Sequence, residues 1–212
     1  MSAGPTVPAG STGPTGPAGP PLLVLVGPPG AGKTTVATEL ARALGARVRD
    51  TDEDVERLDG RTVAAIFVES GEGHFRDLER RAVAAALVEH PGVLALGGGA
   101  VMDPATRQAL HGHRVVFLDV GVAQAAHRVG LDAPRPLLAG NPRARWLDLM
   151  RRRRPVYESV SVLRVATDDR TAEQVAREIV EALDLGGPER ARPGAGDPAA
   201  TGGPAPSERG TT

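Results

Sequence analysis

Lys33 is the only lysine in a chain of 212 residues that carries 25 lysines and arginines in all. It lies within Gly27–Thr35, whose sequence Gly-Pro-Pro-Gly-Ala-Gly-Lys-Thr-Thr fits the phosphate-binding pattern G-x-x-x-x-G-K-[ST]. In such a loop, backbone N–H groups surround a phosphate, and a compact ammonium fits where a planar guanidinium would be too bulky. The chain is therefore expected to bind a nucleoside triphosphate. The expected contacts are Gly30, Ala31, Gly32, Lys33, Thr34 and Thr35.

Two further features are expected to serve a magnesium ion and a substrate hydroxyl. Thr34 follows the lysine, where a hydroxyl normally ligates the Mg²⁺ that bridges the β- and γ-phosphates. Asp50 and Asp52 end a predicted strand, and the alternation of side chains in an extended segment would place both carboxylates on one side. One could hold metal-bound water and the other could accept a proton from a hydroxyl. The alternatives are that they form a solvated acidic turn or that they cap the following helix.

Anion-binding groups occur further along the chain. Gly97–Gly99 follows a buried strand, so its backbone can approach a ligand closely with N–H groups available. Arg76 has Glu79 one helical turn later, in position to hold its guanidinium. Arg135 lies in Gly130–Pro142, an irregular segment rich in glycine and proline that is long enough to be a mobile lid. Arginine brought in by a lid would stabilise the negative charge of a transferring phosphoryl group.

The run Arg151–Arg154 has two interpretations. It could be a solvated helix end that interacts with the helix dipole, or one member could bind a substrate carboxylate with two hydrogen bonds. The five histidines are scattered without a convincing catalytic partner, and we assign them no role.

Alternating strands and helices must position these groups. Strands are expected at 22–26, 47–49, 92–96, 114–119 and 161–166, and helices at 34–44, 53–70, 74–89, 104–111, 121–129, 143–153 and 171–183. This alternation predicts an α/β fold in three α/β/α layers, with a five-stranded parallel sheet and helices on both faces. Ligands bind such sheets at the carboxyl ends of the strands, where Asp50, Asp52 and Gly97–Gly99 fall.

Composition sets further bounds. Residues 1–21 and 186–212 are rich in glycine and proline and are expected to be disordered tails around one folded domain at 22–185. The net charge of -1 gives no electrostatic case for a nucleic-acid or membrane partner. The absence of cysteine excludes disulfides and thiolate chemistry. The N-terminus carries no signal pattern, so we expect a cytoplasmic protein.

Taken together, these residues resemble the shikimate kinase family, small P-loop kinases of the nucleoside-monophosphate-kinase type, over nearly the whole predicted domain. The landmarks are Gly27–Thr35, Asp50-Thr-Asp52, Phe75-Arg76-x-x-Glu79, Leu96-Gly-Gly-Gly99, Arg135-Pro-Leu-Leu138 and Arg153-x-Pro155-x-Tyr157. The first marks any P-loop protein, whereas the others in this order and spacing are specific. The Arg-x-Pro-x-Tyr spacing favours Arg153 over Arg154 as the family arginine.

The resemblance implies phosphorylation of shikimate by ATP with Mg²⁺, and it implies a role for each matching residue. Asp52 would bind the reacting hydroxyl and act as base, and Asp50 would hold metal-bound water. Lys33, Thr34 and the lid residue Arg135 would serve the phosphates and the metal. The remaining implied contacts are Arg76, Arg153, Gly97, Gly98, Gly99, Phe67 and Phe75 for shikimate, and Arg128 and Arg170 for adenine.

Two rival functions stay open from the sequence. A gluconate-type kinase would share the phosphate-binding loop but need not combine the aspartate pair, Arg76 and the three glycines. An ATP-binding switch protein is also possible, whereas a GTP switch is excluded because its Asn-Lys-x-Asp motif needs a second lysine. We expect a monomer that binds only small molecules.

Overall fold

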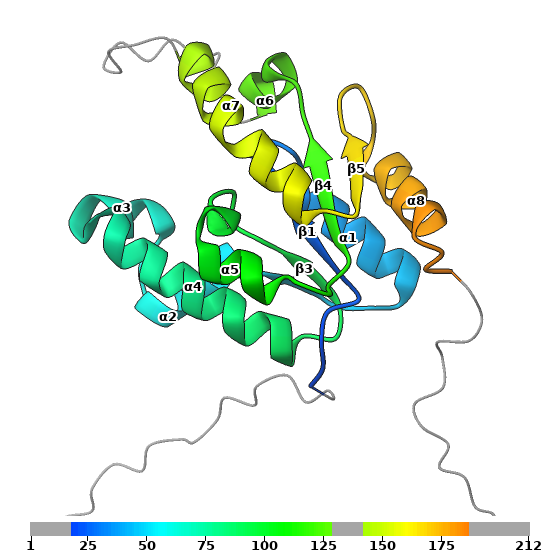
Figure 1. Cartoon of the computed structure of the whole chain (residues 1–212), viewed down its shortest axis with the longest axis horizontal. Helices are drawn as coiled ribbons and strands as arrows, with labels where there is room; N and C mark the ends of the chain where they lie inside the picture. The colour runs from blue at the N-terminus through cyan, green and yellow to red at the C-terminus, as the bar shows by residue number, and fades with distance from the viewer. Residues whose placement is uncertain (1–17, 129–141, 187–212) are drawn as a thin grey trace, which may run out of the picture.

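The computed structural model describes residues 18–128 and 142–186 (Figure 1). Most of both predicted tails and nearly all of the predicted lid, with Arg135, lie outside the described residues. No helix within the described ranges is long and apolar enough to cross a membrane.

The centre of the fold is one parallel sheet, as the sequence predicted. Its strands are β1 (Leu23–Val26), β2 (Val48–Asp50), β3 (Val93–Ala95), β4 (Val115–Asp119) and β5 (Leu163–Ala166). They lie in the order β2-β3-β1-β4-β5, and every neighbouring pair is parallel. β1 is central, with Leu25 aligned to Ala95 on one side and to Val116 on the other. All four residues of β1 are buried, which explains its continuous apolar sequence.

Helices cover both faces of the sheet and complete the three layers (Figure 1). The helical elements are α1 (Lys33–Leu44), α2 (Thr51–Asp59), α3 (Val63–Glu69), α4 (Gly71–Glu89), the 3₁₀ turn η1 (Ala100–Met102), α5 (Pro104–Ala109), α6 (Val122–Arg128), α7 (Pro142–Val160) and α8 (Ala172–Ala182). α1 and α8 pack together on one face, whereas α4, α5 and α7 lie on the other. The three α/β/α layers with a five-stranded parallel sheet, which the sequence predicted, are therefore confirmed.

The structure corrects the prediction of one helix over 53–70. The chain forms two helices there because Gly60 adopts a left-handed conformation, with φ of 81°, and ends α2. Thr62 then caps α3 by accepting a hydrogen bond from the N–H of Ala65. The break folds α2 and α3 against α4 and closes a small apolar cluster that includes Phe75.

The predicted end of the helix near residue 153 is also wrong. α7 continues through Pro155 to Val160, although proline cannot donate the usual backbone hydrogen bond in a helix. Tertiary contacts on both sides of the proline support the continuation. Arg154 pairs with Asp119 at the end of β4, and Tyr157 is fully buried against Phe117.

Candidate active site

The phosphate-binding loop connects β1 to α1. The side chain of Lys33 contacts the start of the loop, where its Nζ donates to the carbonyl oxygens of Gly27 at 3.0 Å and Pro28 at 3.2 Å. Burial lowers the pKa of Lys33, while the charges of Asp52 and Asp50 oppose that shift. Gly27 has no room for a side chain, since a Cβ there would lie 2.5 Å from the carbonyl oxygen of Leu118. The loop is thus fixed against β4, with the N-terminus of α1 open toward an anion.

Asp50 and Thr34 join the second strand to this loop. The hydroxyl of Thr34 donates to Asp50 Oδ2 at 2.8 Å, and Asp50 Oδ1 accepts from the N–H of Asp52 at 3.0 Å. The expectation of an extended Asp50–Asp52 segment is wrong, because Asp50 caps α2 and Asp52 lies in its first turn. The capping alternative holds for Asp50, yet its second oxygen still reaches Thr34. Hydroxyl and carboxylate oxygens form a donor set that suits Mg²⁺.

Asp52 and Glu79 place two unsatisfied carboxylate oxygens around Gly97. Asp52 Oδ1 and Glu79 Oε1 are both buried and lack a hydrogen-bond partner. A Cβ on Gly97 would lie 2.5 Å from the first and 2.6 Å from the second, so a larger residue there would displace both carboxylates. Burial raises the pKa of Asp52, and the nearby charge of Asp50 adds to this. Burial likewise raises the pKa of Glu79, although Arg76 opposes the shift. These oxygens are suited to receive a ligand hydroxyl.

Arg76 is held between two glutamates on α4. Its Nη1 donates to Glu79 Oε2 at 2.6 Å, as the spacing predicted, and its Nε and Nη2 donate to Glu72. The guanidinium lies 5.1 Å from the ring centre of Phe75. The Phe75 ring is tilted against the exposed ring of Phe67, with the ring centres 4.5 Å apart. A side chain on Gly99 would collide with Arg76. Arg76 and the aromatic pair therefore form one wall beside the glycines.

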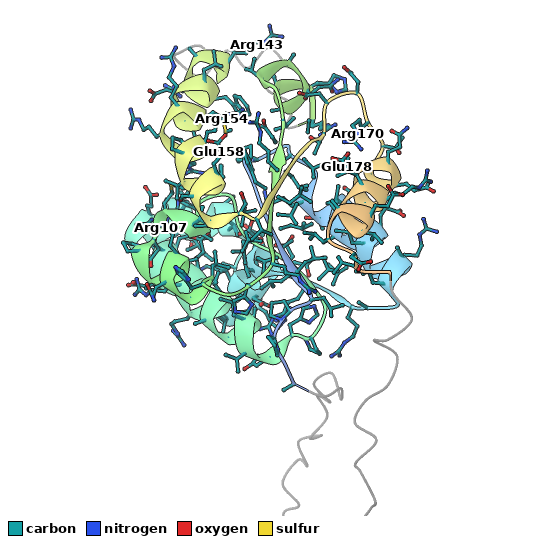
Figure 2. The ribbon with its side chains drawn as sticks, turned by 45° about the vertical axis from the view of Figure 1, so that its right-hand side comes forward. Arg107, Arg143, Arg154, Glu158, Arg170 and Glu178 are labelled. Atoms are coloured by element: carbon teal, nitrogen blue, oxygen red, sulfur yellow. The ribbon has the colours of Figure 1, made fainter. Side chains whose placement is uncertain are left out.

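Arg153 and Arg154 point to different partners. Arg153 Nη1 donates to the carbonyl oxygen of Gly98 at 2.8 Å, so it faces the three-glycine turn. Arg154 makes two 2.7 Å hydrogen bonds to Asp119, which also accepts from Arg164. Figure 2 shows Arg154 on α7. Arg153 therefore faces the three-glycine turn, whereas Arg154 is already paired with a carboxylate, and the choice of Arg153 as the substrate arginine stays a prediction.

Arg128 and Arg170 meet at a cavity of about 210 Å³ beside the phosphate-binding loop. Arg128 donates to the carbonyl oxygens of Gly30 and Thr167, and Arg170 donates to that of Ala166. Arg170 also pairs with Glu178 of α8 (Figure 2). Ala31, Gly32 and Thr35 complete the loop side of the cavity. Two guanidiniums at the rim of a small cavity next to a phosphate-binding loop can enclose a flat base.

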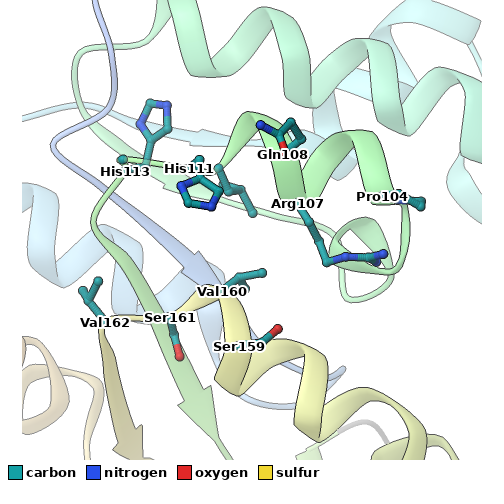
Figure 3. Close-up of a pocket in the computed structure, with 11 residues that line it drawn as sticks. Pro104, Arg107, Gln108, His111, His113, Ser159, Val160, Ser161 and Val162 are labelled. Carbon is teal, nitrogen blue, oxygen red and sulfur yellow. The ribbon is translucent and has the colours of Figure 1, made fainter.

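Another cavity, of about 460 Å³, lies between α5 and the end of α7 (Figure 3). It contains none of the residues singled out from the sequence. It is near the amino ends of β4 and β5, since His113 and Val162 line it. The predicted site lies instead at the carboxyl ends, where the fold brings its described residues together.

Sequence reasoning assigned no role to three residues that organise the site. Thr51 is fully buried, and its hydroxyl accepts from the N–H of Gly97 at 3.0 Å. Tyr157 donates to the carbonyl oxygen of Gly98 at 2.5 Å. Asp119 pairs with Arg154, as described above. Each carried a weak signal: Thr51 separates the two aspartates, Tyr157 closes the Arg-x-Pro-x-Tyr motif, and Asp119 ends a buried strand.

Comparison with known proteins agrees with this geometry. The family model described as shikimate kinase matches residues 29–184. A shikimate kinase of Thermobifida fusca is 56% identical over 167 residues, which cover 79% of this chain and 97% of the relative. One from Salinispora arenicola is 56% identical over 163 residues, covering 77% and 98%. A solved shikimate kinase from Acinetobacter baumannii in complex with shikimate has a TM-score of 0.71 at 36% identity, covering 78% of this chain and 93% of that one. The chain belongs to the shikimate kinase family.

Proposed function

We propose that this protein transfers the γ-phosphoryl group of ATP to the 3-hydroxyl of shikimate, giving shikimate 3-phosphate and ADP. One observation carries the proposal: this member of the family combines a phosphate-binding loop with an acceptor site that is built from carboxylates and arginines. Shikimate offers a carboxylate for the arginines and hydroxyls for the carboxylates. The reaction is a step in the biosynthesis of chorismate and the aromatic amino acids.

Asp52 would act on the acceptor. Its buried and unpartnered Oδ1 is a suitable acceptor for the hydroxyl proton, and its raised pKa makes it a stronger base than an ordinary aspartate. The hydroxyl oxygen would form a bond to the γ-phosphorus while the bond from that phosphorus to the bridging oxygen breaks. ADP leaves with the bridging oxygen, and Asp52 retains the proton. Arg76, Arg153 and the backbone of Gly97–Gly99 would hold the carboxylate and ring, with Phe67 and Phe75 against the ring.

The nucleotide side would use the loop and two arginines. Lys33 can exchange the carbonyls of Gly27 and Pro28 for phosphate oxygens, because an ammonium binds an anion more strongly than neutral acceptors. Arg128 and Arg170 would enclose adenine in the cavity that they border. Thr34 would ligate Mg²⁺ directly and Asp50 through water; the ion would neutralise charge on the β- and γ-phosphates.

Arg135 is proposed to contact the transferring phosphoryl group. This role comes from the Arg-Pro-Leu-Leu motif, and Arg135 lies outside the described residues. We further propose that the catalytic unit is a monomer, since all the proposed contacts come from one chain. We expect it to work in the cytoplasm, where ATP is supplied.

A substrate panel tests the proposal directly. Purified protein is incubated with ATP and Mg²⁺ and with shikimate, gluconate or nucleoside monophosphates, and ADP release is measured. We expect release that depends on shikimate and is at least about a hundredfold faster than with any other panel member, because the buried polar groups stay unpaired with the wrong acceptor.

Other outcomes would count against the proposal in different ways. Turnover of gluconate without turnover of shikimate would establish a different acceptor. ATP binding with no turnover of any panel member would favour a nucleotide switch.

A further inference from the structure

The carbonyl oxygen of Gly98 receives two side-chain donors from α7. Arg153 donates through Nη1 at 2.8 Å, and Tyr157 donates through its hydroxyl at 2.5 Å. A carbonyl oxygen has two lone pairs, so these two donors together satisfy it. The carbonyl belongs to the three-glycine turn that forms one side of the acceptor site.

The two donors differ in what else they can do. Arg153 is partly exposed and carries a charge that would bind a carboxylate more strongly than a neutral carbonyl. Tyr157 is fully buried, and its ring stacks on Phe117 with the ring centres 5.1 Å apart. Burial also raises the pKa of Tyr157, which keeps its proton available for donation at neutral pH. Arg153 can therefore change partners, whereas Tyr157 stays in place.

We propose that Tyr157 is a positioning residue for acceptor binding: it keeps the Gly98 carbonyl hydrogen-bonded while Arg153 turns from that carbonyl to the acceptor carboxylate. Without the hydroxyl, the same movement would leave the Gly98 oxygen without a donor beside a buried turn, which is costly. With the hydroxyl in place, Arg153 can exchange the Gly98 carbonyl for the acceptor carboxylate at a lower cost. This inference rests on the proposed function, since it takes the acceptor to be an anionic small molecule such as shikimate.

Tyr157→Phe tests the inference, because it removes one hydroxyl and keeps the ring that stacks on Phe117. We expect the KM for shikimate to rise about tenfold, which corresponds to ~1.4 kcal/mol. We expect kcat and the KM for ATP to change less than about twofold, since the hydroxyl touches neither reacting group. An unchanged KM for shikimate would overturn the inference. The absence of shikimate-dependent turnover in the unmutated protein would instead overturn the proposed function.

A double-mutant cycle separates positioning from general support of the fold. In an Arg153→Met background no arginine leaves the Gly98 carbonyl, so Tyr157→Phe should raise the KM for shikimate by less than about twofold. An equal tenfold rise in both backgrounds would mean that Tyr157 supports the fold independently of Arg153, and the inference would be wrong.

A spectroscopic test does not depend on a folded variant. Tyr157 is the only tyrosine, so labelling tyrosine with ¹³C at Cζ gives one signal. Adding shikimate should shift the Arg153 Nη signals, whereas the tyrosine signal should stay in the range of a hydrogen-bonded hydroxyl and move only slightly, because Arg153 also interacts with the Tyr157 side chain. A tyrosine signal that moves to the position of an unbonded hydroxyl would contradict the proposal.

Discussion

The nucleotide side and the acceptor side of the site hold their charged groups in different ways. On the nucleotide side, Lys33 and Arg128 donate mainly to neutral backbone carbonyls. On the acceptor side, Arg76 is bound to carboxylates, and Asp52 and Glu79 each keep one buried oxygen without a donor. Arg170, which pairs with Glu178, and Arg153, which donates to the Gly98 carbonyl, are exceptions to this contrast. Among the described residues of the two sides, the buried carboxylate oxygens without a donor lie on the acceptor side, where a ligand can supply one.

This difference suggests where affinity and selectivity come from. On the nucleotide side, a phosphate would replace carbonyl acceptors that bind an ammonium weakly, and any nucleoside triphosphate could supply it. On the acceptor side, a molecule with hydroxyls in the right positions would remove the cost of the unpaired oxygens near Gly97. Selectivity for the acceptor should therefore depend on Asp52 and Glu79 more than on the phosphate-binding loop.

The largest expected effect comes from Asp52→Asn. Loss of the proposed proton acceptor should lower kcat about 10²- to 10⁴-fold. ATP affinity, measured by calorimetry, should stay within about twofold, because Asp52 belongs to the acceptor side. A variant that lost ATP binding with its fold intact would break the separation of the two sides.

Arg153 and Arg154 provide a matched pair for the next effect. Arg153→Leu should raise the KM for shikimate about 10- to 100-fold, which is the scale of a lost hydrogen bond between charged groups. Arg154→Leu should change that KM by less than about threefold, since Arg154 is paired with Asp119. Steady-state kinetics of both variants would show the difference, and the reverse order would refute the choice of arginine.

Glu79→Gln should have a smaller effect, confined to the acceptor side. The amide cannot hold the Arg76 guanidinium as an ion pair, so the KM for shikimate should rise about tenfold. The KM for ATP should stay unchanged and serves as the internal control. Equal changes in both KM values would indicate that the whole site had been disturbed.

The smallest effect concerns stability and pH. The raised pKa of Glu79 means that the folded protein holds the Glu79 proton to a higher pH than the unfolded chain does. The contribution of this proton to the stability of the folded state is complete below about pH 4.3 and is lost as the pH rises through the folded-state pKa. Glu79→Gln does not titrate. The unmutated protein should therefore lose stability relative to the Glu79→Gln variant as the pH rises from 4 to 8, so the unfolding free energy of the variant minus that of the unmutated protein should increase. Urea unfolding across this range measures the trend, and a constant difference would contradict it.

The two sides also differ in how far the sequence predicted them. The phosphate-binding loop is contiguous in the sequence, and its glycines and lysine determine its geometry locally. A local motif was therefore enough to predict what kind of site contains Lys33 and Thr34. The parallel sheet followed from buried apolar strands such as β1. The break at Gly60 was missed because a lone glycine can be tolerated inside a helix.

The acceptor side depends on contacts between distant segments. The hydrogen bond from Gly97 to Thr51 spans 46 residues and that from Tyr157 to Gly98 spans 59, and no local pattern encodes either. The helical start at Thr51 was missed because Asp50 fits both a strand end and a cap. Arg153 was chosen from a family spacing, and its contact with Gly98 required the fold.

Tyr157 and Trp146 are the only tyrosine and the only tryptophan in the chain, and both lie on α7. These two residue types dominate the near-ultraviolet absorption of a protein. Both are buried in the main core. Near-ultraviolet circular dichroism and tryptophan fluorescence would thus report largely on how α7 packs against the core. An optical titration with shikimate would follow the helix that carries Arg153 without any added label.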